Sequence, residues 1–206
     1  MLIPLQGQTP TSSGRCLFLY KYMAATFQFG RDSGDAAGSP AKGTVRTATV
    51  TDVNWKAVTT EGTLYSASPI TDGANSVENW LYGHFSGTFN QISAGLFAHT
   101  NEGADFGAGI TLKGPTSMTV DGDNETYTTP SATTNANLSV NMTSEIAITS
   151  GSAVWFGATG PEAASKAASM TTNPCYTNWL VTQLQTSGAS AGDTSTVTLT
   201  LRYNEN

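Results

Sequence analysis

Three carboxylates at alternate positions, Asp121, Asp123 and Glu125, have the spacing in this chain that comes closest to a known ligand pattern. Oxygen ligands at such intervals in a loop can hold Ca²⁺. The EF-hand loop also needs a glycine at its sixth position, and Thr126 stands there. We therefore interpret the segment as a solvated acidic turn and predict no metal site.

The sequence contains two histidines, His84 and His99, and neither lies in a motif that would supply it with a partner. A catalytic histidine needs a nucleophile or a metal ion held within hydrogen-bonding reach. No GxSxG, HExxH, P-loop or GxGxxG pattern occurs. We therefore predict no catalytic residue, no cofactor and no enzymatic activity.

Asp32, Asp35 and Glu102 are isolated acids in loop-like segments. Glycoside hydrolysis needs two carboxyl groups that face each other across the substrate. A glycan hydrolase or depolymerase would therefore need a fold that builds such a cleft. Nothing in the spacing of these acids favours one.

Four tryptophans, Trp55, Trp80, Trp155 and Trp179, could form a flat platform for sugar rings, as in carbohydrate-binding modules. Each of them, however, lies within an apolar strand pattern. Large rings in such patterns usually bury their surface in a core. We therefore predict that the tryptophans pack inside the protein.

Cys16 and Cys175 are the two cysteines of the chain, and they lie near opposite ends. They could pair only with each other, which would close a very long loop. Small folds that depend on disulfides carry more cysteines, so we expect two free buried thiols. No CxxC motif or Cys/His cluster occurs, which excludes a structural zinc site.

Charged residues make up 12% of the 206 residues, and the net charge is −6. This share is about half of the usual ~25%. The basic residues are scattered, whereas binding to nucleic acid requires clustered basic groups, so no nucleic-acid partner is predicted. A surface rich in Thr, Ser, Gly and Asn does little to discourage association and suits a protein that packs against copies of itself or other partners. Many secreted β-sandwiches share this composition.

The N-terminus lacks a positively charged start, and no stretch approaches ~20 apolar residues. We therefore expect synthesis in the cytoplasm and no membrane partner. Asn124, Asn137 and Asn141 match the N-glycosylation acceptor pattern. Without a secretory signal we interpret them as ordinary turn and strand residues.

Residues 77–92 form the segment around which we expect the fold to be organised. In an extended chain, successive side chains point to opposite faces. Trp80, Tyr82 and His84 would lie on one face, and Leu81, Phe85 and Phe89 on the other. Because both faces carry large rings, we expect a central strand that is covered on both sides.

Further short strands are expected along the chain, with Gly, Pro, Asn and Asp turns between them. Residues 160–170 are the one helix candidate, since Pro161 precedes a run of alanines, with a loop of small residues as the alternative. The expected strands cover residues 16–22, 26–29 after a turn, 44–53, 55–58, 63–66, 95–99, 108–113, 117–120, 138–142, 145–149, 153–156, 176–185 and 196–203.

This pattern predicts an all-β fold, an antiparallel β-sandwich that resembles a jelly roll, with at most one short helix near residues 161–170. Residues 1–15 contain Pro4 and Pro10, which disfavour regular pairing, and we interpret them as an extended arm or a first edge strand. Residues 31–43 form either a linker or an exposed hairpin loop. We therefore expect an N-terminal part of residues 1–43 and a main domain of residues 44–206, with a single domain of residues 1–206 as the alternative.

Two blocks of the sequence resemble a loosely described group of tailed-bacteriophage virion proteins. The first is Asn75-Ser-Val-Glu-Asn-Trp-Leu81 followed by His84-Phe-Ser-Gly-Thr-Phe-Asn-Gln-Ile-Ser93. The second runs from Tyr176-Thr-Asn-Trp-Leu-Val-Thr-Gln-Leu184 to Thr198-Leu-Thr-Leu-Arg-Tyr-Asn-Glu205. Ser86, Ala191-Gly192 and Asn204 stand where that group usually has Thr, Pro-Gly and Asp.

The resemblance implies a structural component of the phage particle without enzymatic activity. A capsid decoration or cement protein in many copies is the preferred role. The alternatives are a tail or neck protein of the same particle and a carbohydrate-binding or host-adhesion module. Its partners would be copies of itself, in a homo-oligomer, and other virion proteins such as the major capsid or tail proteins. Its location would be the virion, assembled in the cytoplasm of the bacterial host, and the arm of residues 1–15 could reach a neighbour by strand addition.

Overall fold

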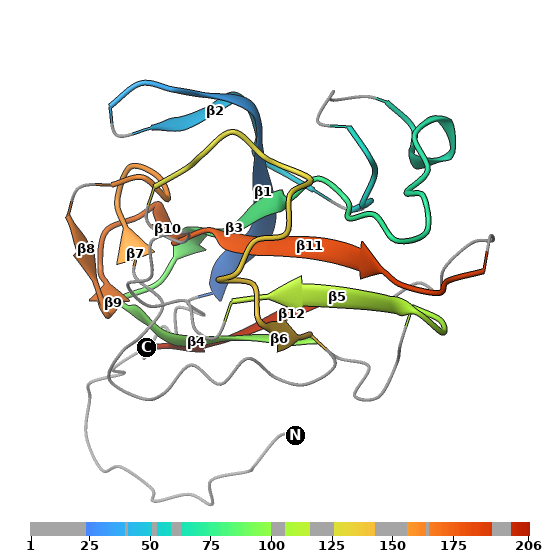
Figure 1. Ribbon diagram of the computed structural model, residues 1–206. Coiled ribbons are helices and arrows are strands. Elements are labelled where there is room, and N and C mark those ends of the chain that lie inside the picture. Colours follow the sequence, from blue (N-terminus) through green and yellow to red (C-terminus); the bar gives the residue numbers. More distant parts are fainter. Residues whose placement is uncertain are drawn as a thin grey trace, which may run out of the picture.

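The protein is described by a computed structural model, which covers residues 24–39, 41–50, 53–58, 63–99, 106–115, 126–142, 156–163, 165–190 and 199–206 (Figure 1). Within these ranges the chain is almost entirely β, with a single 3₁₀ turn. The elements are β1 (Ala24–Ala37), β2 (Lys42–Thr47), η1 (Tyr65–Ala67), β3 (Asn79–Thr88), β4 (Ile92–His99), β5 (Ile110–Gly114), β6 (Val140–Asn141), β7 (Phe156–Gly157), β8 (Lys166–Ala167), β9 (Ser169–Met170), β10 (Cys175–Thr177), β11 (Leu180–Thr186) and β12 (Leu199–Glu205).

The strands form a nine-stranded sheet and a three-stranded sheet. The larger sheet has the order β6-β5-β11-β3-β10-β7-β8, with β1 also paired to β3 and β2 paired to β1. The smaller sheet has the order β12-β4-β9. All strand pairs in the described ranges are antiparallel. The predicted antiparallel all-β sandwich is therefore confirmed, and the jelly-roll connectivity stays a prediction.

β3 is the central strand of the larger sheet, as its sequence predicts. β1 pairs along one side of it, from Ala24↔Thr88 to Asp32↔Trp80. β10 and β11 pair along the other side. Figure 1 shows β3 in the middle of the molecule, flanked by these strands.

The two faces of β3 contribute to two separate apolar clusters. Leu81 and Phe85 of β3, and Phe89 just after the strand, belong to the main core between the sheets, together with Phe156, Leu180 and Leu201. Trp80 and Tyr82 belong to a second cluster on the outer face, which contains Tyr127, Leu138, Trp179 and Val181. Period-two alternation thus sends each ring of this strand to the face that the sequence predicts.

β10 and β11 together replace the single strand expected at residues 176–185. Both pair with β3, but the register moves by one residue between Tyr176↔His84 and Leu180↔Leu81. This is a β-bulge with one extra residue on the β10–β11 side. The hydroxyl of Thr177 accepts the backbone N–H of Gly83 at 2.8 Å, which satisfies a donor at the break. Because of the extra residue, Trp179 lies in the outer cluster and Leu180 in the core.

The segment 31–43 is a hairpin and not a linker. β1 continues to Ala37 and β2 begins at Lys42. The register shifts between Ser33 and Ala36, so a bulge absorbs the loop-like residues within β1. The expected division after residue 43 falls inside this hairpin, and β1 shares a sheet with β3. β1 also begins at Ala24, so no turn lies between residues 24 and 29.

The helix candidate at residues 160–170 is wrong for the residues described there, which form turns and the short strands β8 and β9. A Cβ at Gly157 would lie 2.6 Å from the carbonyl oxygen of Gly160, so the chain turns back directly over β7. β8 then pairs with β7. Pairing within the sheet therefore overrides the helix propensity of the alanines.

Several expected strands differ from the structure or lie outside it. Residues 55–58 and 63–66 form no regular strand, because their backbone groups bond singly, as in Val77 N–H to the carbonyl of Lys56 at 2.9 Å. β2 ends at Thr47, before the expected boundary, and its Val45 is 40% exposed. The expected strands at 16–22, 117–120 and 145–149 and the arm at 1–15 lie outside the described residues.

Gly30 of β1 lies directly opposite Tyr82 of β3. A Cβ at Gly30 would lie 2.1 Å from Cζ of Tyr82, so the ring occupies the space above the glycine backbone. Covering a strand glycine with a cross-strand aromatic ring is a known way to stabilise a sheet. The outer cluster therefore requires glycine at this position.

We predict that Gly30→Ala lowers the free energy of unfolding by about 1–3 kcal/mol, the usual cost of overpacking. The change should show as a lower urea midpoint with an unchanged slope. In a Tyr82→Leu background the same substitution should cost clearly less, because the overlapping ring is gone. Equal costs in both backgrounds would contradict this account of Gly30.

Candidate functional site

His84 lies on the outer face of β3 and stacks on the Tyr176 ring, with centroids 4.7 Å apart and an interplanar angle of 14°. Partial burial lowers the pKa of its imidazole. Its position opposite Tyr176 and Gln28 in the ladder makes it part of a cross-strand row. His99 is in β4, and the acidic turn at 121–125 lies outside the described residues.

The tryptophans that the structure describes are core residues, as predicted. Trp80 and Trp179 are completely buried and meet edge to face at 5.8 Å. Trp55 is partly buried, packs edge-on against Phe106, and donates its indole N–H to the Thr182 hydroxyl at 3.2 Å. Trp155 lies outside the described residues. No flat row of exposed indole rings exists among these three.

The carboxylate of Asp32, a residue that is 1% exposed, is held by three side-chain donors. It accepts two hydrogen bonds from the Arg46 guanidinium, both at 2.7 Å. It accepts a third from the indole N–H of Trp179 at 2.8 Å. Asp32 is therefore not the isolated loop acid expected from the sequence, and its register opposite Arg46 and Trp80 sets these contacts.

Arg46 also binds Glu162, with Nη1 donating at 3.0 Å and Nη2 at 2.7 Å. Its guanidinium lies 5.5 Å from the centroid of the Tyr82 ring. Burial alone would lower the pKa of Arg46, but its hydrogen bonds to both carboxylates raise it well above its ordinary value. Burial alone would raise the pKa of Glu162, but the bonds and charge of Arg46, with the charge of Lys42, lower it. Arg46 thus ties β1, β2 and the turn after β7 together.

A second polar network holds the irregular segment 130–135 against the sheet. The buried carboxylate of Glu78 accepts the Asn135 side-chain amide at 2.9 Å and the Ser131 N–H at 3.3 Å. The Gln183 side-chain amide donates to the carbonyls of Ser131 at 3.3 Å and Thr133 at 3.0 Å. These bonds satisfy the Ser131 N–H and the Thr133 carbonyl, and the Ser131 carbonyl also accepts the backbone N–H of Glu78 at 3.2 Å.

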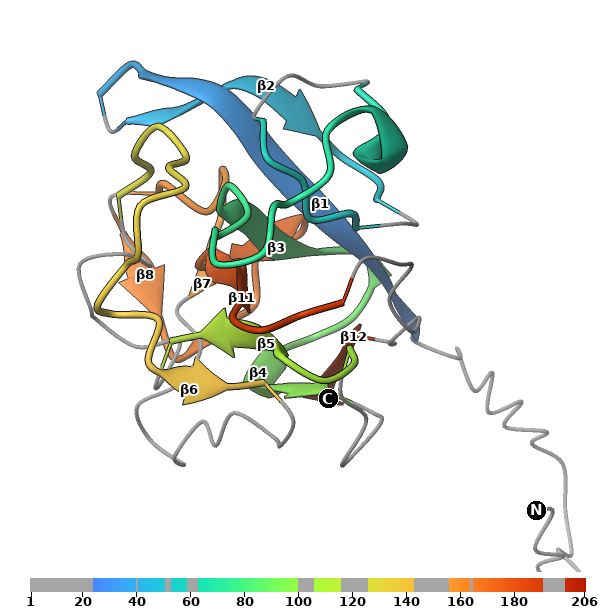
Figure 2. The same ribbon diagram turned by 45° about the vertical axis from the view of Figure 1, so that its right-hand side comes forward.

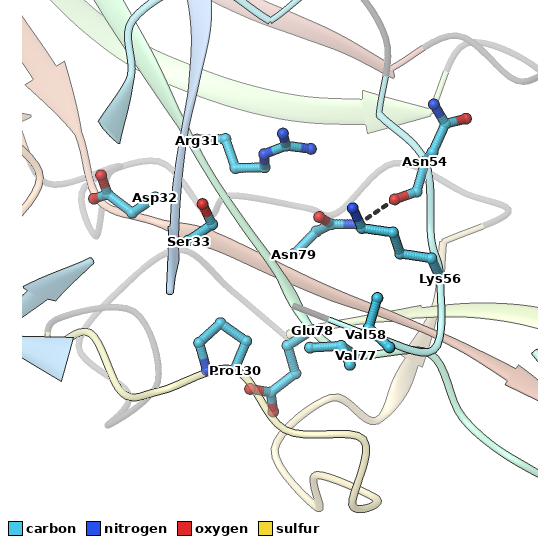
Figure 3. Close-up of a pocket in the computed structure, with 10 residues that line it drawn as sticks. All are labelled: Arg31, Asp32, Ser33, Asn54, Lys56, Val58, Val77, Glu78, Asn79 and Pro130. Atoms are coloured by element: carbon cyan, nitrogen blue, oxygen red, sulfur yellow. Dashed lines mark hydrogen bonds between the residues drawn. The ribbon is translucent and has the colours of Figure 1, made fainter. Parts of the chain in front are cut away.

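A small cleft lies between β1, the start of β3 and residues 54–58, and both Asp32 and Glu78 are among the residues that line it (Figure 3). Its volume of about 20 Å³ has room for one water molecule. Figure 3 shows the two carboxyl groups pointing away from each other. Since both are also occupied by structural donors, the cleft lacks the facing pair of carboxylates that glycoside hydrolysis needs.

A larger hollow of about 270 Å³ lies beside β5. The described residues that line it are apolar or neutral, with Phe106, Ile110, Leu112 and Met142 as the large side chains. These residues include no acid or base, and the hydroxyl of Thr111 therefore has no base among them to activate it.

Cys175 is a free cysteine with no exposed surface, and burial raises the pKa of its thiol to about 12. It is therefore a packed and unreactive thiol, as predicted, whereas Cys16 lies outside the described residues. Asn137 and Asn141 are exposed, and the side-chain oxygen of Asn141 accepts the Lys113 ammonium at 2.6 Å.

In the ranges that the structure covers, no three His, Cys, Asp or Glu side chains gather in a group that could hold a metal ion. The same ranges contain no helix of the length and apolarity needed to cross a membrane. Comparison of the chain with protein-family models, curated proteins and solved structures gives no match.

Sequence reasoning missed Asp32, Glu78 and Gln183 as the polar centres of the fold. The sequence does indicate that Glu78 is buried, because an acid near Val77 and Trp80 in an apolar strand pattern needs hydrogen-bond partners inside the protein. Asp32 and Gln183 have no such indication, because their partners are distant in the sequence and are brought together by strand register.

We predict that Glu162→Gln lowers the free energy of unfolding at neutral pH by roughly 1 kcal/mol, the upper range for an exposed pair. Because the folded-state pKa of Glu162 is lowered, its contribution is fully present above the unfolded value of 4.5 and is lost as pH falls through the folded pKa. The wild type and variant should therefore converge as urea unfolding is repeated from pH 6 towards pH 3. Asp35→Asn is the control, because it removes an exposed carboxylate from the β1–β2 hairpin that carries Arg46. An equal loss of unfolding free energy in this variant would contradict a specific role of the Arg46–Glu162 pair.

We predict that Gln183→Leu loosens residues 131–133 and speeds the exchange of their amide hydrogens, because it removes a donor to the carbonyls of Ser131 and Thr133. Gln185→Leu is the matched control, since its amide bonds the Gln183 side chain at 3.2 Å instead of the loop. Exchange mass spectrometry on the intact protein measures both. Unchanged protection of 131–133 in Gln183→Leu would show that other contacts fix this loop.

Proposed function

We propose that this chain is a non-enzymatic structural component of a tailed-bacteriophage particle, a capsid decoration or cement protein that assembles in many copies. The observation that carries the proposal is the position of the two sequence blocks that resemble virion proteins. Residues 75–93 supply β3 and the start of β4, and residues 176–205 supply most of β10 and all of β11 and β12. β3 pairs with β10 and β11, and β4 pairs with β12. Two blocks that are distant in sequence are thus partners in the same core.

The chemistry of the buried polar groups supports the same proposal. The carboxylates of Asp32 and Glu78 are engaged by structural donors, and the described histidine side chain, His84, stacks on a tyrosine. A chain with 12% charged residues favours packing against other subunits over isolation. The partners in this proposal are copies of the chain and the major capsid protein.

A tail or neck position in the same particle is the alternative, because packing motifs are compatible with any of these locations. The sugar-binding alternative loses its main support, since Trp80 and Trp179 are completely buried. An adhesion module would need a different platform from the one that the tryptophans suggest.

Electron microscopy of particles produced without this protein tests the proposal. We expect loss of a defined density on the capsid surface and lower resistance of the particles to heat or low salt, because a cement protein stabilises the shell. Re-expression of the wild-type chain is the control and should restore the density. Tailless particles would move the protein to the tail or neck. Normal particles, with the protein absent from purified wild-type virions by mass spectrometry, would overturn the virion role.

A further inference from the structure

We draw no further inference here: the strongest candidate, the apolar hollow lined by Phe106, Ile110, Leu112 and Met142 beside β5, which Figure 2 shows between β6 and β11, carries none because no contact among the described residues shows what covers it.

Discussion

A buried carboxylate with three donors is the interaction on which the outer half of this structure depends. Removing Asp32 from water carries a large desolvation cost, which is compensated only if all its strong donors are in place. Arg46 supplies two hydrogen bonds and Trp179 the third. These residues lie on β1, β2 and just before β11, so the hairpin, the central sheet and the outer cluster must form together.

The same constraint explains why β2 holds its place although it buries little apolar surface. Val45 is 40% exposed, so packing alone would fix the strand weakly. The guanidinium of Arg46 instead bridges Asp32 and Glu162, and the Tyr82 ring lies over Gly30 beneath it. Direction-dependent polar bonds thus specify the position of a strand that hydrophobic burial leaves underdetermined.

The alternation of Trp80 and Tyr82 with Leu81 and Phe85 was sufficient to predict the central strand and its two covered faces, because side-chain direction in a strand is a local property. The helix expected at residues 160–170 is wrong because the weak helix propensity of its alanines is outweighed by the pairing of β8 with β7. Most contacts of the candidate site could not be predicted from the sequence. Asp32 and Trp179 are 147 residues apart, and the bulge after Tyr176 that orients Trp179 has no composition signal.

The central position of β3 has a consequence for synthesis on the ribosome. Its partner β1 emerges before it, whereas β10 and β11 emerge about 90 residues later. One edge of β3 in the nascent chain therefore has no strand partner until residues 175–186 have been synthesised. Such an unpaired edge is a binding site for chaperones and for other nascent chains of the same polysome.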